Sequence, residues 1–317
     1  MRKPIVYPHP AEELTTLLPE LRDFRSVGRL IKTEMEVRLA DGQTSKALDC
    51  LDDGLSFGRG VQAGALTSGV VGLLVENTIL KSFSRHMDQL NLRDRDKLSG
   101  IARRRLTQED VQPGIVSRER AVYARTFRNH RSDALGLLST LDPGPNASRT
   151  ARTEFSDVRE MLRRKPEEGP ALMDSMVELI NTHYNATLGE LKRPVWARGY
   201  PATQDRSSPA ARLLFAICPR SYAQCGDRFA SERTLLQLIA VHAAVIRYRI
   251  LHKHLPDDLE QVNPGGVGTD VFTGGPLRFT RLGEDKWEVS SAGPWDRGDE
   301  SSGSGGRRTP IIVQYRN

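Results

Sequence analysis

The spacing of apolar residues changes near residue 250, and this change constrains the fold more than any other feature. Before that point apolar residues recur at steps of three and four, beginning with Leu14, Leu17, Leu18, Leu21 and Phe24. A step of this size places side chains on one face of an α-helix, whereas strict alternation is typical of a strand. Alternation begins only at residue 277. We therefore predict an all-helical domain over residues 1–230 and a smaller α+β domain over residues 231–317.

The helical part divides at turn signals. Asp41-Gly42 separates a first helix from a second helix that carries Leu48, Leu51 and Leu55 on one face. This helical hairpin has the style of a tetratricopeptide unit, although no second copy follows at a period of about 34 residues. We expect one shared core beneath the pair, formed by Leu17, Leu21, Phe24, Leu48, Leu51 and Leu55.

Further helices are predicted along the chain, with an irregular connection at 192–211 that is rich in Pro, Arg and small polar residues. The expected helices are 63–90, 94–106, 117–141, 153–164, 171–191 and 231–253.

Composition favours a soluble globular protein, with 38% hydrophobic and 27% charged residues. The net charge of +6 invites a nucleic-acid partner, but no zinc-finger, KH or RRM signature accompanies it. The longest uncharged apolar stretches, 63–75 and 234–246, are shorter than the roughly 18–20 residues of a spanning helix. Residues 1–10 lack the apolar region of a signal peptide. We expect either a cytoplasmic protein or the soluble part of a parent with an upstream membrane anchor.

The C-terminal domain is expected to be one long helix and a three-stranded antiparallel meander. The strands are predicted at 277–281, 287–290 and 310–316, with a hairpin at 283–285 and a short helical turn at 255–262. Trp287 should be at least half buried, because a large aromatic side chain is a natural cover for one face of a small sheet.

Three segments of this region carry a resemblance: "RYRILHKHLPDDLEQV", "DVFTGGPLRF" and "WEVSSAGPWDRGD". In this order they resemble the globular domain of the major pseudopilins of type II secretion systems. They are still more similar to the pseudopilin-like tail of uncharacterised bacterial envelope protein families. The similarity covers residues 233–317 and implies a pseudopilin-like fold and an extracytoplasmic setting. The matching residues are Tyr248, Arg249, Leu255, Pro256, Leu259, Asp270, Phe272, Thr273, Gly274, Pro276, Leu277, Phe279, Ser291, Gly293, Pro294 and Asp299.

The resemblance also implies a metal site, because the terminal loops of major pseudopilins hold calcium. Closely spaced carboxylates in a Gly/Ser loop are suitable oxygen ligands for this ion. The alternative is a solvated loop whose acids offset neighbouring arginines at 297, 307 and 308. The candidate calcium ligands are Ser291, Asp296, Asp299 and Glu300.

Two other local patterns leave alternatives open. His252 and His254, near Asp257 and Asp258, have the residue types of a zinc site, but no third ligand follows at a motif spacing, and histidines at a helix C-terminus more often serve its preference for partial positive charge. Residues Cys218 and Cys225 flank a short loop and could close a disulfide in an oxidising compartment.

Catalytic motifs are sparse. The segment "GLSFG" around Ser56 fits the nucleophile-elbow pattern formally, but it lies in a helical stretch where the required strand-to-helix turn is not expected. We therefore predict a non-enzymatic bacterial envelope protein that acts in assembly or binding related to type II secretion-like systems, with a protein partner. The alternative is a soluble helical scaffold that binds a protein or peptide, and a hydrolase is the third hypothesis.

Overall fold

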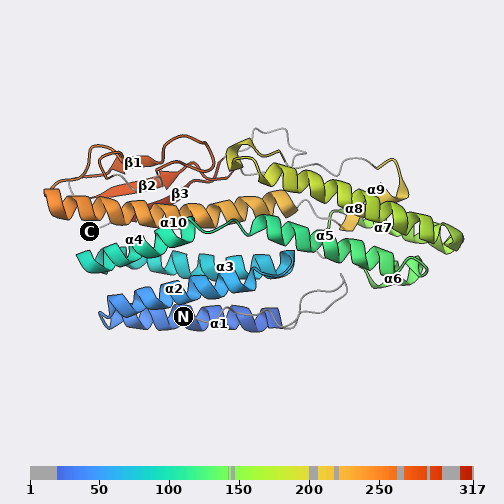
Figure 1. The fold of residues 1–317 in the computed structure, drawn as a ribbon, viewed down its shortest axis with the longest axis horizontal. Coiled ribbons are helices and arrows are strands. Elements are labelled where there is room, and N and C mark those ends of the chain that lie inside the picture. Colours follow the sequence, from blue (N-terminus) through green and yellow to red (C-terminus); the bar gives the residue numbers. More distant parts are fainter. Residues whose placement is uncertain are drawn as a thin grey trace.

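The computed structural model describes residues 20–141, 143, 147–199, 206–217, 221–262, 268–283, 286–294 and 308–315. These residues form an elongated, mostly helical molecule with one small antiparallel sheet near the C-terminus (Figure 1). The predicted class, helices followed by a three-stranded antiparallel sheet, is confirmed.

The first four helices pack side by side beneath the rest of the chain (Figure 1). Gly42 ends α1 with a left-handed backbone (φ 70°), and Asn91 caps α4 by accepting a hydrogen bond from the Asp94 amide (2.9 Å). Helices α2 and α3 approach closely at Gly58 and Gly72, where neither residue has a side chain. A Cβ atom on Gly72 would lie only 2.3 Å from the Gly58 carbonyl oxygen. The elements are α1 (Glu20–Ala40), α2 (Thr44–Val61), α3 (Leu66–Phe83), η1 (Ser84–Gln89) and α4 (Leu92–Leu106).

The middle of the chain forms a second group of helices at the other end of the molecule (Figure 1). Its buried centre includes Phe127, Phe155, Met176 and Tyr184. The elements are α5 (Gln112–Asn129), α6 (Ala134–Thr140), α7 (Arg149–Arg164), η2 (Pro166–Glu168), α8 (Gly169–Leu191), η3 (Val195–Ala197) and α9 (Pro209–Ile217).

Helix α10 (Ser221–His252) runs between α3 and α4 on one side and the sheet on the other (Figure 1). The sheet has the order β1-β2-β3, with β1 (Arg278–Arg281), β2 (Trp287–Ser291) and β3 (Ile311–Tyr315). Val289 is paired with Phe279 on one side and with Val313 on the other. The predicted meander is thus confirmed, and Trp287 is fully buried, as expected.

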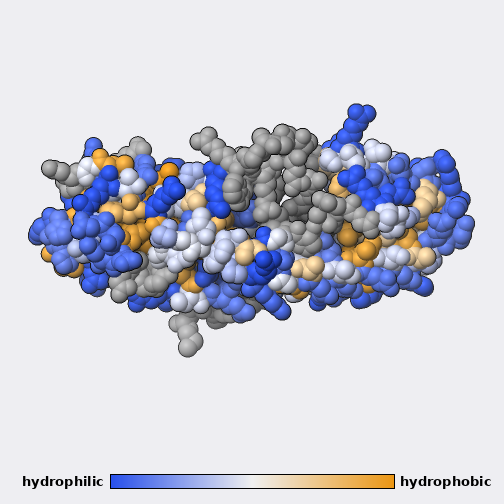
Figure 2. Space-filling view, turned by 90° about the horizontal axis from the view of Figure 1, so that it is seen from above, coloured by the Kyte–Doolittle hydropathy of each residue, from blue (hydrophilic) through white to orange (hydrophobic). Residues whose placement is uncertain are grey.

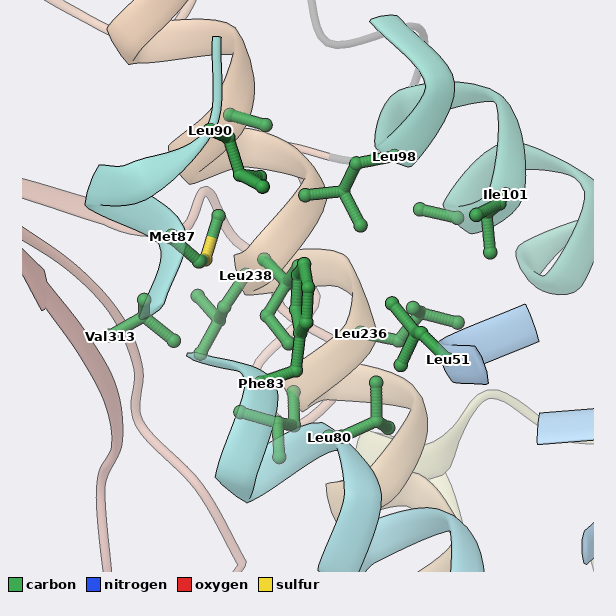
Figure 3. Packing of buried hydrophobic residues seen from close by; sticks show 14 of the residues in the cluster. Leu51, Leu80, Phe83, Met87, Leu90, Leu98, Ile101, Leu236, Leu238 and Val313 are labelled. Atoms are coloured by element: carbon green, nitrogen blue, oxygen red, sulfur yellow. The ribbon is translucent and has the colours of Figure 1, made fainter. Parts of the chain in front are cut away.

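One continuous core joins α1–α4, α10 and the sheet. Figure 3 shows Phe83 of α3, Leu98 of α4 and Leu238 of α10 pointing toward one another, with Val313 of β3 nearby. The predicted boundary between residues 230 and 231 falls inside α10, which begins at Ser221. The division into domains 1–230 and 231–317 stays a prediction.

The predicted N-terminal core is correct for α2 and wrong for α1. Leu48, Leu51 and Leu55 are buried together, whereas Leu21 and Phe24 are only half buried. Both residues lie in the first turns of α1, where the ring of Phe24 meets that of Phe57 edge-on, with 5.9 Å between centroids. Leu17 lies outside the described residues.

Several element boundaries also differ from expectation. The predicted helix 117–141 is two helices, because the chain turns at residues 130–133 between α5 and α6. The connection 192–211 ends in α9, which was not expected. The predicted helical turn at 255–262 consists of bends and a turn, and the hairpin residues 284–285 lie outside the described residues.

Within α10, residues Cys225–His252 are long and apolar enough to cross a membrane by length and composition alone, but 67% of the most apolar 18-residue window in this stretch is buried inside the protein. A core helix of a soluble protein has the same composition. The surface seen from the sheet side is mostly hydrophilic, with hydrophobic residues gathered mainly toward the two ends of the molecule (Figure 2).

Trp287 tests the packing of the sheet on α10. Its ring stacks on His242 with 5.4 Å between centroids. We expect Trp287→Ala to lower the free energy of unfolding by about 3–5 kcal/mol, because it leaves a large cavity. Chemical denaturation is the measurement, with Ile312→Ala on the exposed side of β3 as the matched control (43% exposed). Equal losses in the two variants would contradict the described packing.

Glu119 gives a second test, of pH dependence. Its carboxylate accepts a hydrogen bond from the Leu66 amide at the start of α3 (2.8 Å), and burial raises its pKa from 4.5 to about 7. Between these values the folded protein holds a proton that the unfolded chain releases, so stability falls as pH rises.

Glu119→Gln keeps a side-chain oxygen acceptor but removes the titration. Relative to this variant, we expect the parent protein to lose up to about 3 kcal/mol of unfolding free energy between pH 4.5 and pH 7.5. Denaturation curves across this pH range measure the difference in unfolding free energy between the parent protein and the variant. The contributions of the other titrating groups are the same in both proteins and cancel in this difference. A difference that does not change with pH, or that grows in favour of the parent as pH rises, would refute the assignment.

Candidate functional site

A cleft of about 540 Å³ runs along α10, and we take it as the candidate binding site. Its other walls come from α4, from η3 and from two segments that follow α10, at 261–262 and 269–271. Both the helical part and the C-terminal part of the chain therefore contribute to it.

One stripe of α10 forms the floor of the cleft: Arg233, Gln237, Ala240, Ala244 and Arg247. Steps of three and four place them on one face of the helix. The two alanines leave room in the middle, and at a rise of about 1.5 Å per residue the two arginines are roughly 21 Å apart along the axis. The floor is long and narrow.

The lining of the cleft is positively charged. Arg103, Arg233 and Arg247 contribute to it, and the described lining includes neither Asp nor Glu. Arg247 pairs with Asp96 outside the lining (3.2 Å), and Arg233 donates to the Leu106 carbonyl oxygen. Arg103 makes no ion pair within the described part of the chain.

Aromatic and amide side chains stand at the edges of the cleft. Trp196 is 51% exposed and lies against Gly274, where a Cβ atom would be 2.8 Å from the indole. Tyr248 donates from its hydroxyl to Gln261 (3.2 Å), and the ring of His252 stacks on it at 4.1 Å between centroids. These contacts hold flat side chains in place around a space with apolar patches.

A smaller chamber of about 270 Å³ adjoins the cleft, and the two share Leu106, Arg233 and Val271 as lining residues. Glu76 of α3 and Glu232 of α10 both line this chamber, and each carboxyl group influences the pKa of the other. Burial raises the pKa of Glu76 well above its ordinary value, and the charge of Glu232 raises it further. Burial also raises the pKa of Glu232 to about 7.

Basic and amide groups surround this acid pair. The charges of Arg59 and Arg105 lower the pKa of both carboxyls, while burial lowers the pKa of Arg59 itself. Gln62, only 1% exposed, lies close enough to Glu76 to favour its charged form. Its side-chain nitrogen nevertheless lacks a partner with hydrogen-bond geometry among the described residues. The chamber is thus polar, partly open and incompletely hydrogen-bonded.

Of the four predicted calcium ligands, the structure describes only Ser291. Its hydroxyl donates to Asp270 (2.8 Å) and accepts from the Gly293 amide (3.0 Å). Asp296, Asp299 and Glu300 lie outside the described residues, so the calcium site stays a prediction.

Asp270 joins the segments that carry the pseudopilin resemblance. It is buried and accepts hydrogen bonds from the Phe272 amide (2.9 Å), the Ser291 hydroxyl and the Ala292 amide (2.8 Å). Gly293 completes the junction with a left-handed backbone (φ 71°) at a point where a Cβ atom would overlap the Thr309 carbonyl oxygen. Residues from two separate segments thus form one structural junction.

The other candidate sites are not assembled among the described residues. His254 bonds to the Leu255 carbonyl (2.9 Å) and Asp257 pairs with Arg281 (2.8 Å). The rings of His252 and His254 are 6.1 Å apart, with no third ligand gathered beside them in the described residues. Cys225 is buried and burial raises its thiol pKa, while Cys218 lies outside the described residues. Ser56 lies within α2 and donates to the Asp52 carbonyl (2.7 Å).

Sequence reasoning missed the cleft and the acid pair, although both leave a signal. Glu76 is the single acidic residue in the otherwise apolar helix "LTSGVVGLLVENTILKSF". The pair Ala240 and Ala244, between arginines on the same face of α10, marks the floor of the cleft. Neither signal shows which elements of the fold pack against these residues.

Comparisons of the chain with protein-family models, with curated proteins and with solved structures found no match.

One experiment separates the contribution of Asp270 to stability from that of calcium. We expect Asp270→Ala to lower the melting temperature by several degrees, because it leaves three donors without their acceptor, at about 1–3 kcal/mol for each buried group. The effect should be equal in calcium and in chelator. Asp258→Ala, at an exposed position, is the control.

The same melts test the calcium loop. If calcium binds there, the parent protein melts higher with calcium than with chelator, by up to about 2.7 kcal/mol of stability at a hundredfold excess over Kd, and Asp296→Ala and Asp299→Ala remove the difference. Equal melting points in the parent protein would eliminate the site.

Proposed function

We propose that this protein is a non-enzymatic binding protein of the bacterial cell envelope and that its cleft along α10 holds an acidic, extended peptide segment of a protein partner. The observation that carries the proposal is a lining with three arginines and no acidic residue among those described. Such a lining attracts negative charge and repels basic ligands.

The dimensions of the cleft support a peptide. An extended chain rises about 3.3 Å per residue, so six residues match the roughly 21 Å between Arg233 and Arg247. Leu106, Leu251 and Val262 offer apolar contacts, and Trp196 and Tyr248 offer flat ones. Acidic residues alternating with apolar ones would satisfy both kinds of wall.

The envelope setting rests on the resemblance of residues 233–317 to pseudopilin-like domains. With it we propose an anchor outside this chain, calcium in the 291–300 loop and a role in assembly related to type II secretion-like systems. The hairpin of α1 and α2 is proposed to be tetratricopeptide-like. A soluble scaffold that binds a peptide is the second candidate, and the contribution of Thr269 and Val271 to the cleft favours a direct role of the C-terminal part in either case.

The proposal predicts charge-dependent peptide binding. A fluorescein-labelled hexapeptide of alternating glutamate and leucine should bind in fluorescence anisotropy, and a lysine-leucine hexapeptide should not. Arg103→Glu should weaken binding at least tenfold, because it replaces attraction by repulsion in a partly desolvated groove. Added salt should weaken the parent complex.

Arg104→Glu is the matched control, because Arg104 lies next on the same helix but pairs with Asp52 (3.2 Å) and is not part of the cleft lining. Equal binding of the acidic and basic peptides, or equal effects of the two charge reversals, would overturn the proposal.

A further inference from the structure

The smaller chamber has two buried nitrogen donors without acceptors. Gln62 Nε2 and Arg198 Nη1 both belong to lining residues, and neither has a hydrogen-bond partner among the described residues. Arg198 is held in place by its other nitrogens, which donate to the carbonyl oxygens of Arg193 (3.0 Å) and Leu191 (3.2 Å). Buried donors of this kind are costly unless a ligand or water accepts from them.

The charge of the residues that line the chamber favours an anionic acceptor. Four arginines line the chamber, namely Arg59, Arg105, Arg198 and Arg233, against Asp110 and the acid pair. Since both carboxyls line one buried chamber and the charge of Glu232 raises the pKa of Glu76, the pair favours holding one proton, as two like charges in such a site repel. A protonated carboxyl is also a donor. With the pair carrying one proton, the four arginines leave the chamber positively charged, and Gln62 Nε2 and Arg198 Nη1 are the donors that an anion could use.

We propose that the smaller chamber is a carboxylate-binding site that receives the C-terminal carboxylate of the peptide lying in the cleft. The proposal rests on the proposed function for its ligand, since the chamber meets the cleft at Arg233. A carboxylate has two oxygens that accept charge-assisted hydrogen bonds from amide and guanidinium nitrogens. A volume of about 270 Å³ holds the last residue of a peptide and excludes a bulky headgroup.

The acid pair makes this binding proton-linked. The groups that act on Glu76 and Glu232 are Arg59 and Gln62 from α2 and its end, Arg105 from α4 and Arg233 from α10, while Asp110, before α5, acts on Arg59. The bound carboxylate adds negative charge beside the pair and so favours its protonated form. Binding takes up a proton, and affinity rises as pH falls, by at most about tenfold per pH unit for one proton.

The first experiment compares the glutamate-leucine hexapeptide with a free C-terminus and with an amidated C-terminus. The free acid should bind the parent protein at least tenfold more tightly at pH 6 than the amide does. In Gln62→Leu the two peptides should bind equally, because a donor to the carboxylate is lost. Gln89→Leu, at an exposed position on η1, is the control. Circular dichroism verifies that both variants are folded.

The second experiment uses a ligand that is small enough to occupy the chamber without lying in the cleft. Glutarate, titrated by calorimetry, should bind more tightly at pH 6 than at pH 8, and inorganic phosphate should bind at least tenfold more weakly than glutarate. In Glu232→Gln the pH dependence should flatten and binding at pH 8 should tighten, because a negative charge is removed. These readouts separate a ligand site from a merely structural charge network.

The outcomes are distinguishable. If the acidic hexapeptide binds through Arg103 but amidation has no effect, the carboxylate site is refuted while the proposed function stands. If glutarate binds in a Gln62-dependent manner but the hexapeptides do not bind, the chamber stands as a carboxylate site for a small acid and the cleft proposal fails. Absence of glutarate binding, or stronger binding of phosphate, overturns the carboxylate assignment.

Discussion

The packing of α10 between the first helices and the sheet is the interaction on which the rest of the structure depends. Its buried side chains face two ways, toward Phe83 and Leu98 on one side and toward Trp287 and Val313 on the other. A small sheet is stabilised when its hydrophobic face packs against another element such as a helix. The sheet therefore owes its stability to α10, and the cleft exists because the same helix keeps a third face free of covering side chains.

Helix α10 also explains why charge is tolerated in the interior. Where α2 and α3 approach through Gly58 and Gly72, the side chain of Glu76 lies against Gly58, with its Cγ atom 2.4 Å from the place that a Cβ of Gly58 would take. Glu232 meets it there with Arg59 and Arg105. An isolated buried carboxylate would be costly, whereas a proton-sharing pair beside guanidinium groups is less so. Helices α2, α3 and α10 therefore meet at a buried cluster of charged side chains, and this cluster lines the smaller chamber.

Much of the fold could be predicted from local pattern, because helix and strand periods depend on burial within one element. Leu48, Leu51 and Leu55 follow the helical period and are buried, and Trp287 and Val289 follow the strand period and are buried. Phe24 follows the same helical period but is only half buried, because periodicity does not reveal where along its length a helix is covered. The short α9 was missed because nine residues beside a Pro-rich connection carry too little pattern.

The candidate site was less accessible to sequence reasoning. The cleft needs Arg103, Trp196 and Val271 to meet, and their separation along the chain gives no periodic signal. Asp270 was visible as part of a motif, but its role as the acceptor for Ser291 and Ala292 depends on how two loops pack. The calcium ligands Asp296, Asp299 and Glu300 follow from resemblance alone and stay a prediction.

The hydrogen bond from the Thr309 amide to the Pro294 carbonyl (3.0 Å) has a consequence for engineering. It fixes the two ends of the segment 295–308 beside each other, next to the junction at Asp270 and Gly293. Because the entropy of closing a loop grows only with the logarithm of its length, a doubling of this segment would cost about 0.6 kcal/mol. A fluorescent domain or an affinity tag inserted after the proposed calcium ligands and before Arg308 is therefore expected to keep the register of β2 and β3.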